Sequence, residues 1–192
     1  MMFGKNPGTD KTATLIPEGS IGAELGVWKG DSSAKFIKRA KHIHLVDSWT
    51  VEAYQGSDEH GGYDAYLNRY SELVGSDNPA DFQKYYDKIY RSVVKRFAGQ
   101  SVTIHRMPTD KWFDTFTEKL DWIYVDASHS YEGCLHDLNK SWNMIKVGGY
   151  LLCDDFSDKK QDVKNAIKEF AKQKNLPIDN FYMDQVKFVK EN

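Results

Sequence analysis

Two apolar runs in the second half of the chain each end in acidic residues. Residues 120–125 are followed by Asp126, and residues 148–153 are followed by Asp154 and Asp155. Both runs have the length and the nearly continuous apolar character of strands buried on both faces, which is typical of a parallel sheet. Parallel neighbours lie about 4.8 Å apart. If these two strands are neighbours, three carboxylates meet at one edge of the sheet.

Strand-like and helix-like segments alternate along most of the chain. The alternation predicts an α/β fold, with a doubly wound, mostly parallel seven-stranded sheet and helices on both faces. Right-handed crossovers place the functional crevice of such a fold at the carboxyl ends of its strands. A helix is expected to begin near residue 131 and to end at Gly148 and Gly149. The other expected strands are 21–27, 43–47 and 102–105, with one or two more within 180–189, and a second helical stripe covers 163–171.

The size and charge of the chain narrow the classes of function. Its 192 residues suit one domain, so we expect residues 1–192 to fold as a single unit. With 26 basic and 28 acidic residues, the composition favours neither nucleic acid nor an anionic membrane as a partner. We find neither the apolar core of a signal peptide nor a membrane-spanning run, and expect a cytoplasmic protein. Cys134 and Cys153 are expected to be buried apolar side chains rather than a disulfide.

Two segments depart from the simple alternation. Residues 1–17 are polar and hold several glycine and proline residues, so we expect a loose N-terminal arm. Residues 50–100 are too long for one crossover helix and predict a helical insertion between the second and third strands. Within it, the glycine-flanked stretch 54–64 is a candidate lid over a substrate. The tyrosines of the insertion recur at helical spacing, which favours packing over ligand contact.

A glycine-containing turn and a later acid indicate a nucleoside site. Gly26 and Gly30 follow the first expected strand, where glycine lets the backbone turn sharply and lets a ligand approach closely. Asp47 ends the second strand 21 positions after Gly26, the spacing at which such folds offer a carboxylate to ribose hydroxyls. The alternative is that the glycines only tighten a turn and Asp47 only caps a helix. Trp28 stands where a dinucleotide motif needs its second glycine, which argues against a diphosphate ligand.

The acidic edge predicts a metal site. Carboxylates this close raise each other's pKa unless a cation joins them, and magnesium, calcium or manganese suits carboxylate oxygens. We therefore expect Asp126, Asp154 and Asp155 to bind a divalent ion. Capping of the next helix is the alternative for the adjacent pair, but it explains only one acid. His129 lies near the same edge and suits a general base, with a backbone-bonded histidine at a helix start as the alternative.

These motifs together resemble the class I S-adenosylmethionine-dependent methyltransferases. More narrowly, the chain looks like the small metal-dependent O-methyltransferases of the macrocin and mycinamicin sugar-methylating type. The resemblance covers about residues 18–160. It is carried by two blocks, Glu24-Leu25-Gly26-Val27-Trp28-Lys29-Gly30-Asp31-Ser32-Ser33 and the stretch from Asp121 through Val125-Asp126-Ala127-Ser128-His129-Ser130-Tyr131-Glu132, with Asp137-Leu138, Trp142, Gly148-Gly149 and Asp154-Asp155.

The resemblance implies the Rossmann-like methyltransferase fold, S-adenosylmethionine as the methyl donor and magnesium as a second cofactor. It implies that Asp47 holds the ribose hydroxyls and that His129 matches the base of some relatives, while others place an acid at the position of Ser128. The acceptor would be a hydroxyl of a small molecule, a sugar or glycoside above all, with a phenol left open. Relatives often self-associate, so a homo-oligomer stays open. The implied cofactor-binding residues are Glu24, Gly26, Trp28, Gly30, Asp47 and Asp126, and the implied magnesium ligands are Asp126, Asp154 and Asp155.

Two other functions compete with methyl transfer at this stage. A module with the same fold that has lost the reaction would bind the nucleoside and transfer nothing. A nicotinamide-dependent oxidoreductase would bind NAD, which the indole of Trp28 disfavours.

Overall fold

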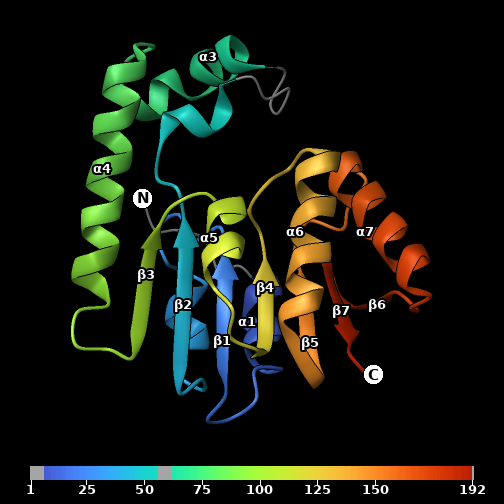
Figure 1. The fold of residues 1–192 in the computed structure, drawn as a ribbon. Coiled ribbons are helices and arrows are strands. Elements are labelled where there is room, and N and C mark those ends of the chain that lie inside the picture. Colours follow the sequence, from blue (N-terminus) through green and yellow to red (C-terminus); the bar gives the residue numbers. More distant parts are fainter. Residues whose placement is uncertain (1–6, 56–61, 192) are drawn as a thin grey trace.

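A computed structural model describes residues 7–55 and 62–191. Its centre is a seven-stranded sheet with the strand order β3-β2-β1-β4-β5-β7-β6 (Figure 1). Strands β1 to β5 are parallel, and β7 pairs antiparallel with both β5 and β6. The predicted doubly wound, mostly parallel sheet is therefore confirmed. The strands are β1 (Ile21–Leu25), β2 (His42–Asp47), β3 (Val102–Arg106), β4 (Leu120–Val125), β5 (Ile145–Cys153), β6 (Asp179–Tyr182) and β7 (Gln185–Val189).

Helices cover both faces of the sheet because its central strands are apolar on both sides. Along β4, Ile123 packs into the cluster on one face, whereas Trp122 and Tyr124 pack into the cluster on the other. The first face is covered by α5 (Thr109–Thr115), α6 (Tyr131–Met144) and α7 (Gln161–Lys174). The second face is covered by α1 (Pro7–Ala13), α2 (Ser33–Phe36) and α4 (Pro79–Arg96).

The expected end of the helix after β4 was wrong. Helix α6 ends at Met144, and Ile145 is already the first residue of β5, with an extended backbone at φ −76° and ψ 136°. Ile145 is buried and pairs with Leu120 of β4, so sheet pairing overrides its helical spacing. Gly149 lies inside the strand, where a Cβ atom would come within 2.6 Å of the Asp121 carbonyl oxygen.

The described part of the N-terminal arm is ordered helix rather than a loose segment. Residues 7–13 form α1, in which Thr12 is fully buried. The Thr12 hydroxyl donates to Oε1 of Gln185 on β7 at 2.7 Å. The polar composition concealed this contact, because the buried groups of α1 are hydroxyls satisfied by hydrogen bonds rather than apolar side chains.

The long segment between β2 and β3 is helical, as predicted. It contains the short 3-10 helix η1 (Val51–Tyr54), then α3 (Tyr63–Val74) and α4. Asn78 caps α4 by accepting from the Ala80 amide at 2.9 Å, with Pro79 in the first turn. Figure 1 shows α3 beyond the carboxyl ends of the parallel strands. Residues 56–61 of the predicted lid lie outside the described residues, so that lid stays a prediction.

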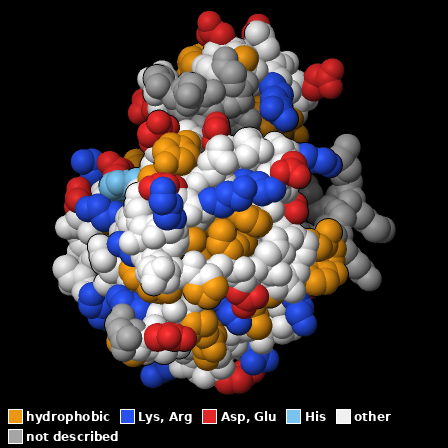
Figure 2. All heavy atoms as spheres, turned by 90° about the vertical axis from the view of Figure 1, so that its right-hand side faces the viewer, with side chains coloured by type: hydrophobic (Ala, Val, Ile, Leu, Met, Phe, Trp, Pro, Cys, Tyr) orange, Lys and Arg blue, Asp and Glu red, His pale blue; other side chains and the backbone are white. Residues whose placement is uncertain are grey.

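The surface has mixed charge on the face that Figure 2 shows, where basic and acidic side chains are interspersed. Among the described helices, none has the length and apolar character needed to span a membrane.

Candidate active site

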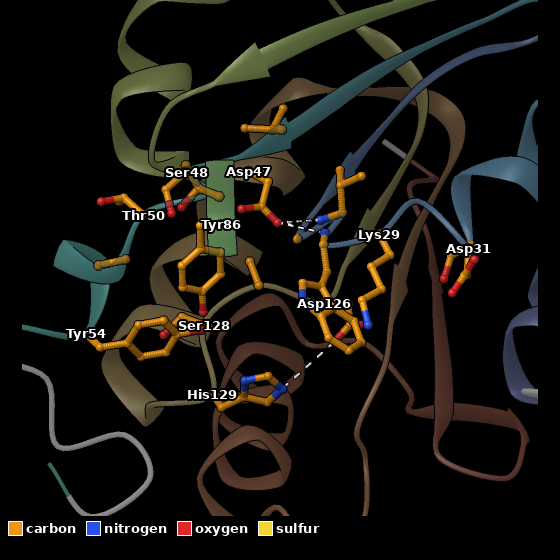
Figure 3. A pocket seen from close by; sticks show the side chains of 18 of the residues that line it. Lys29, Asp31, Asp47, Ser48, Thr50, Tyr54, Tyr86, Asp126, Ser128 and His129 are labelled. Atoms are coloured by element: carbon orange, nitrogen blue, oxygen red, sulfur yellow. Dashed lines mark hydrogen bonds and ion pairs between the residues drawn. The ribbon is translucent and has the colours of Figure 1, made fainter. Parts of the chain in front are cut away.

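A cleft of about 970 Å³ lies at the carboxyl edge of the sheet. The turn after β1 lines one side of it with Gly26 and Trp28. Asp126 and His129 line it where β4 ends, and Tyr54 of η1 lines it from the helical insertion (Figure 3). The cleft is therefore at the edge where the sequence placed the functional crevice.

Steric contact explains the first glycine of the turn. Gly26 has φ +84°, and a Cβ atom there would lie 1.8 Å from the Asp126 carbonyl oxygen. The backbone of β4 thus passes too close for any side chain, and the Asp126 amide donates to the Leu25 carbonyl at 2.9 Å. Gly30 also has a positive φ, and a Cβ atom there would lie 2.6 Å from the Phe97 ring. Of the two glycines, Gly26 lines the cleft.

Asp47 holds the same turn in place from the end of β2. Its Oδ2 accepts from the amides of Val27 at 3.0 Å and Trp28 at 2.8 Å, and its Oδ1 accepts from the Trp49 amide at 2.8 Å. Burial raises the pKa of Asp47, and these three backbone donors oppose that rise. Trp28 itself is 44% exposed, and the Lys29 ammonium lies 4.0 Å from the centre of its indole ring.

Glu24 does not reach the cleft surface. It is only 1% exposed, and its carboxylate accepts a hydrogen bond from the Ser33 hydroxyl in the interior. Burial raises its pKa to about 8, against the hydrogen bond from Ser33, and the charge of Asp47 adds to the rise. In this arrangement, Glu24 therefore does not contact a cofactor in the cleft directly.

Three acidic or basic groups converge where β4 and β5 end. Asp126, His129 and Asp155 each offer a ligand atom, and these atoms all lie within 4.8 Å of one another. The Nε2 atom of His129 is 2.8 Å from Oδ2 of Asp155 and 3.9 Å from Oδ1 of Asp126. His129 is held in the turn before α6, which Ser130 caps by accepting from the Gly133 amide at 3.1 Å. The histidine is therefore bonded to a carboxylate, not only to backbone.

Asp154 faces a different set of partners from the one expected. Its Oδ2 accepts from the Tyr124 hydroxyl at 2.6 Å, and its Oδ1 accepts from the Asp155 amide at 2.8 Å and from the Gln185 side chain. The structure thus brings ligand atoms of Asp126, His129 and Asp155 within 4.8 Å of one another, and Asp154 is near enough for its charge to act on Asp126. The capping alternative for the acidic pair is also wrong, because α7 starts only at Gln161 with Lys160 as its N-cap.

The charges of this cluster are unbalanced. Burial raises the pKa of Asp126 well above its usual range, and the nearby carboxylates of Asp154 and Asp155 raise it further. Burial also acts to raise the pKa of Asp155, but the hydrogen bond and charge of His129, helped by Lys160, hold that pKa below its usual value. The Lys160 ammonium lies 3.6 Å from Oδ2 of Asp155 and lines the cleft. Sequence reasoning missed Lys160, since nothing in its local pattern sets it apart from Lys159.

The helical insertion also contributes to the site. Tyr54, Tyr66, Tyr70 and Tyr86 line the cleft, although Tyr66 and its neighbours pack in a small apolar cluster of their own. The prediction that these tyrosines serve in packing therefore describes only part of their role, because the same rings form part of the cleft wall.

Comparison with known proteins identifies the family. Residues 23–156 match the family model described as a methyltransferase domain. The uncharacterized protein R132 of Acanthamoeba polyphaga mimivirus is 31% identical over 45 residues, which is 23% of this chain. That match spans 20% of the relative's length. The family match overturns the alternative of a nicotinamide-dependent oxidoreductase.

Solved structures share the fold at low sequence identity. SMU.1697c of Streptococcus mutans, solved with S-adenosylhomocysteine, has a TM-score of 0.57 and 11% identity, with 97% of each chain covered. An rRNA methylase of Streptococcus thermophilus has a TM-score of 0.58 and 12% identity, with 100% of this chain and 99% of that chain covered. The O-methyltransferase NovP has a TM-score of 0.57 and 18% identity over 95% of this chain and 76% of its own. The strand order, the cleft and the family match agree, and the chain belongs to the methyltransferase domain family.

Proposed function

We propose that this enzyme methylates a hydroxyl group of a small molecule with the help of a divalent cation, magnesium above all. The observation that carries the proposal is the convergence of Asp126, His129 and Asp155 within 4.8 Å of one another beside the cleft. A sugar or glycoside is the acceptor class that the sequence resemblance implies. The balance of 26 basic and 28 acidic residues supports a small molecule over a nucleic acid.

The residues present suit a hard cation. Asp126 and Asp155 supply carboxylate oxygens, which magnesium and manganese prefer. The pKa of Asp126 is raised first by burial and then by the negative charges of Asp154 and Asp155, which a cation would offset. We assign these two carboxylates as the ligands. Asp154 is assigned as a neighbour that adds negative charge while Tyr124 and Gln185 hold it. A bound divalent ion would lower the pKa of an acceptor hydroxyl and fix its direction.

The other end of the cleft suits the methyl donor. Gly26 lines the cleft, and Asp47 lies where ribose hydroxyls are bound in folds of this type. Trp28 presents its half-exposed indole to the same cleft. S-adenosylmethionine supplies an electrophilic methyl group, so the residues of the chain need only align the acceptor oxygen and remove its proton.

His129 is the proposed general base. When its Nε2–H donates to Asp155, Nδ1 is the basic nitrogen of the ring, and the carboxylate orients the imidazole. The proton of the acceptor hydroxyl would then pass to Nδ1. Asp155, which also lies 3.6 Å from the Lys160 ammonium, would hold the imidazole in place during that transfer.

Methyl transfer can be tested with S-adenosylmethionine labelled in its methyl group and a panel of sugars, glycosides and phenols. We expect transfer to a hydroxyl that depends on Mg²⁺ and stops in excess chelator. Asp155→Asn should abolish turnover while leaving the affinity for S-adenosylhomocysteine unchanged. Asp158→Asn is the matched control, because Asp158 is 89% exposed and pairs with Lys164.

Two outcomes would contradict the proposal. Full turnover in excess chelator would remove the metal from the reaction. Binding of S-adenosylhomocysteine without transfer to any hydroxyl in the panel would support the alternative of a module that has lost the reaction.

A further inference from the structure

The tyrosines of the helical insertion form a continuous wall of the cleft. We call this set, Tyr54, Tyr66, Tyr70 and Tyr86, the tyrosine wall. All four line the cleft that also contains Asp126 and His129. Figure 3 shows Tyr54 and Tyr86 on the side of the cleft where Ser128 and His129 lie.

The geometry of the wall is that of a ring stack. The rings of Tyr54 and Tyr66 are 3.9 Å apart between centroids and only 11° from parallel. Tyr66 is anchored below by Phe82, at a centroid distance of 5.6 Å, and both of these residues are buried. The stack therefore rests on a rigid base, and its partly buried member Tyr54 lines the cleft. A further flat ring placed in the cleft against Tyr54 would extend it.

The hydroxyl groups of the wall are already engaged with each other. The hydroxyls of Tyr66 and Tyr86 are 2.5 Å apart, and Tyr86 is also hydrogen-bonded to Tyr54. These bonds fix the orientation of the rings. They also mean that the wall presents ring surface more than hydrogen-bonding capacity to a ligand.

A bare sugar and an aromatic ring make different demands on such a wall. Each hydroxyl of a buried sugar needs a polar partner. Around the tyrosine wall, the described cleft lining adds the apolar side chains of Leu73, Val74 and Phe82, together with the hydroxyl-bearing Thr50 and Tyr85. The Thr50 hydroxyl is already bonded to Gln83. A flat, unsaturated ring can stack on Tyr54 and leave no polar group unsatisfied.

We propose that the tyrosine wall binds an aromatic ring carried by the methyl acceptor, with the reacting hydroxyl directed toward Asp126 and His129. This assignment depends on the proposed function in one respect, which is that the bound aromatic ring is identified as part of the methyl acceptor. The methylated hydroxyl can belong to the aromatic ring itself or to a sugar attached to it. Both sources share the stacking ring, and the test below separates them.

Binding can be measured without turnover, by titration calorimetry of the full chain saturated with S-adenosylhomocysteine and Mg²⁺. The matched probes are 2,3-dihydroxynaphthalene and its fully saturated analogue, decahydronaphthalene-2,3-diol. We expect the aromatic diol to bind about 2- to 12-fold more tightly, the range that an aromatic pair contributes beyond its buried area. Comparison of 2-naphthyl β-D-glucopyranoside with methyl β-D-glucopyranoside measures the aromatic contribution on a sugar, and comparison of the naphthyl glucoside with 2,3-dihydroxynaphthalene tells whether an attached sugar adds affinity.

Variants of Tyr54 decide whether the wall is responsible. Tyr54→Leu should remove the preference for the aromatic probe, whereas Tyr54→Phe, which keeps the ring, should retain it. Tyr182→Leu is the control, because Tyr182 is 39% exposed on β6 and does not line the cleft. Unchanged affinity of Tyr54→Leu for S-adenosylhomocysteine will show that the variant is folded.

Three results would overturn the assignment. These are equal binding of the aromatic and saturated diols, no measurable binding of either, or an aromatic preference that survives in Tyr54→Leu. By contrast, an aromatic probe that binds through Tyr54 but is never methylated would contradict the proposed function and leave the binding site standing.

Discussion

The Nε2 atom of His129 lies 2.8 Å from Oδ2 of Asp155, and the same oxygen lies 3.6 Å from the Lys160 ammonium. One carboxylate oxygen thus joins the turn before α6 to the end of β5 and the start of α7. A cation that binds Asp155 through Oδ2 must share this oxygen with both neighbours. The chemistry of the site therefore depends on whether this oxygen interacts with His129, with Lys160 or with a cation.

His129→Asn tests whether the histidine acts as a base or as a metal ligand. As a base, its loss should lower kcat by about 10²- to 10⁴-fold while the affinity for Mn²⁺ changes little. The activity loss should shrink as pH rises, because hydroxide replaces the missing base. His136→Asn, an exposed histidine on α6, is the control. A loss of Mn²⁺ affinity of tenfold or more would identify His129 as a ligand instead.

Lys160→Met should strengthen metal binding. The Lys160 ammonium interacts with the carboxylate that we assign to the ion, and Lys160 and Asp155 are 36% and 28% exposed, so solvent weakens their attraction. Removing this competitor should tighten Mn²⁺ binding about fivefold, which corresponds to roughly 1 kcal/mol. Lys159→Met removes the same charge from the exposed neighbouring residue and should change the affinity far less. Weaker binding in Lys160→Met would show that the lysine supports the ion.

Glu24 should make the protein less stable as pH rises. Its pKa is raised from 4.5 to about 8 by burial, so the folded state keeps a proton that the unfolded state releases. The stabilisation is complete below pH 4.5 and is lost as pH rises through about 8. Chemical denaturation between pH 6.5 and 9 should show a fall in unfolding free energy.

The Glu24→Gln variant isolates that contribution. Glutamine keeps the shape of the side chain and its bond to Ser33 but cannot ionise, so the fall in unfolding free energy should be smaller by several kcal/mol at most. Glu52→Gln, on an exposed residue of η1, should leave the pH dependence as it is. An identical pH profile in wild type and Glu24→Gln would show that Glu24 is ionised in the folded state.

Gly26→Ala should damage both stability and donor binding. A Cβ atom at Gly26 would lie 1.8 Å from the Asp126 carbonyl oxygen, so β1 and β4 would have to separate locally. Gly99→Ala is the matched control, because Gly99 has φ +77° but a Cβ atom there would meet nothing within 4 Å. The control should lose about 1–2 kcal/mol from its backbone conformation alone, and Gly26→Ala should lose more. Equal losses in thermal unfolding would contradict a steric role for Gly26.

Much of the sheet follows from local sequence. Runs such as 120–125 and 148–153 are apolar on both faces and end in acids, which indicated parallel neighbours with a functional edge. Gly26 and Asp47, which the sequence singled out by their spacing, both line the cleft. These features can be predicted because each of them lies within a short segment of the sequence.

The details that the sequence did not reveal depend on contacts between distant segments. Asp154 turns toward Gln185, which β7 brings from a segment with a weak pattern. Thr12 is buried because it meets the same glutamine. Lys160 joins the acidic cluster only because α7 starts beside β5. Ile145 leaves the helical stripe because pairing with β4 outweighs its local preference.

The central claim is that Asp126 and Asp155 hold a divalent ion beside the methyl donor. Anomalous scattering from crystals grown with Mn²⁺ and S-adenosylhomocysteine tests it most directly. The account predicts one strong peak about 2.1–2.2 Å from oxygens of both carboxylates, with adenosine next to Asp47 and the sulfur facing the ion. A peak elsewhere, or a cleft that admits S-adenosylhomocysteine with no Mn²⁺ between Asp126 and Asp155, would contradict it.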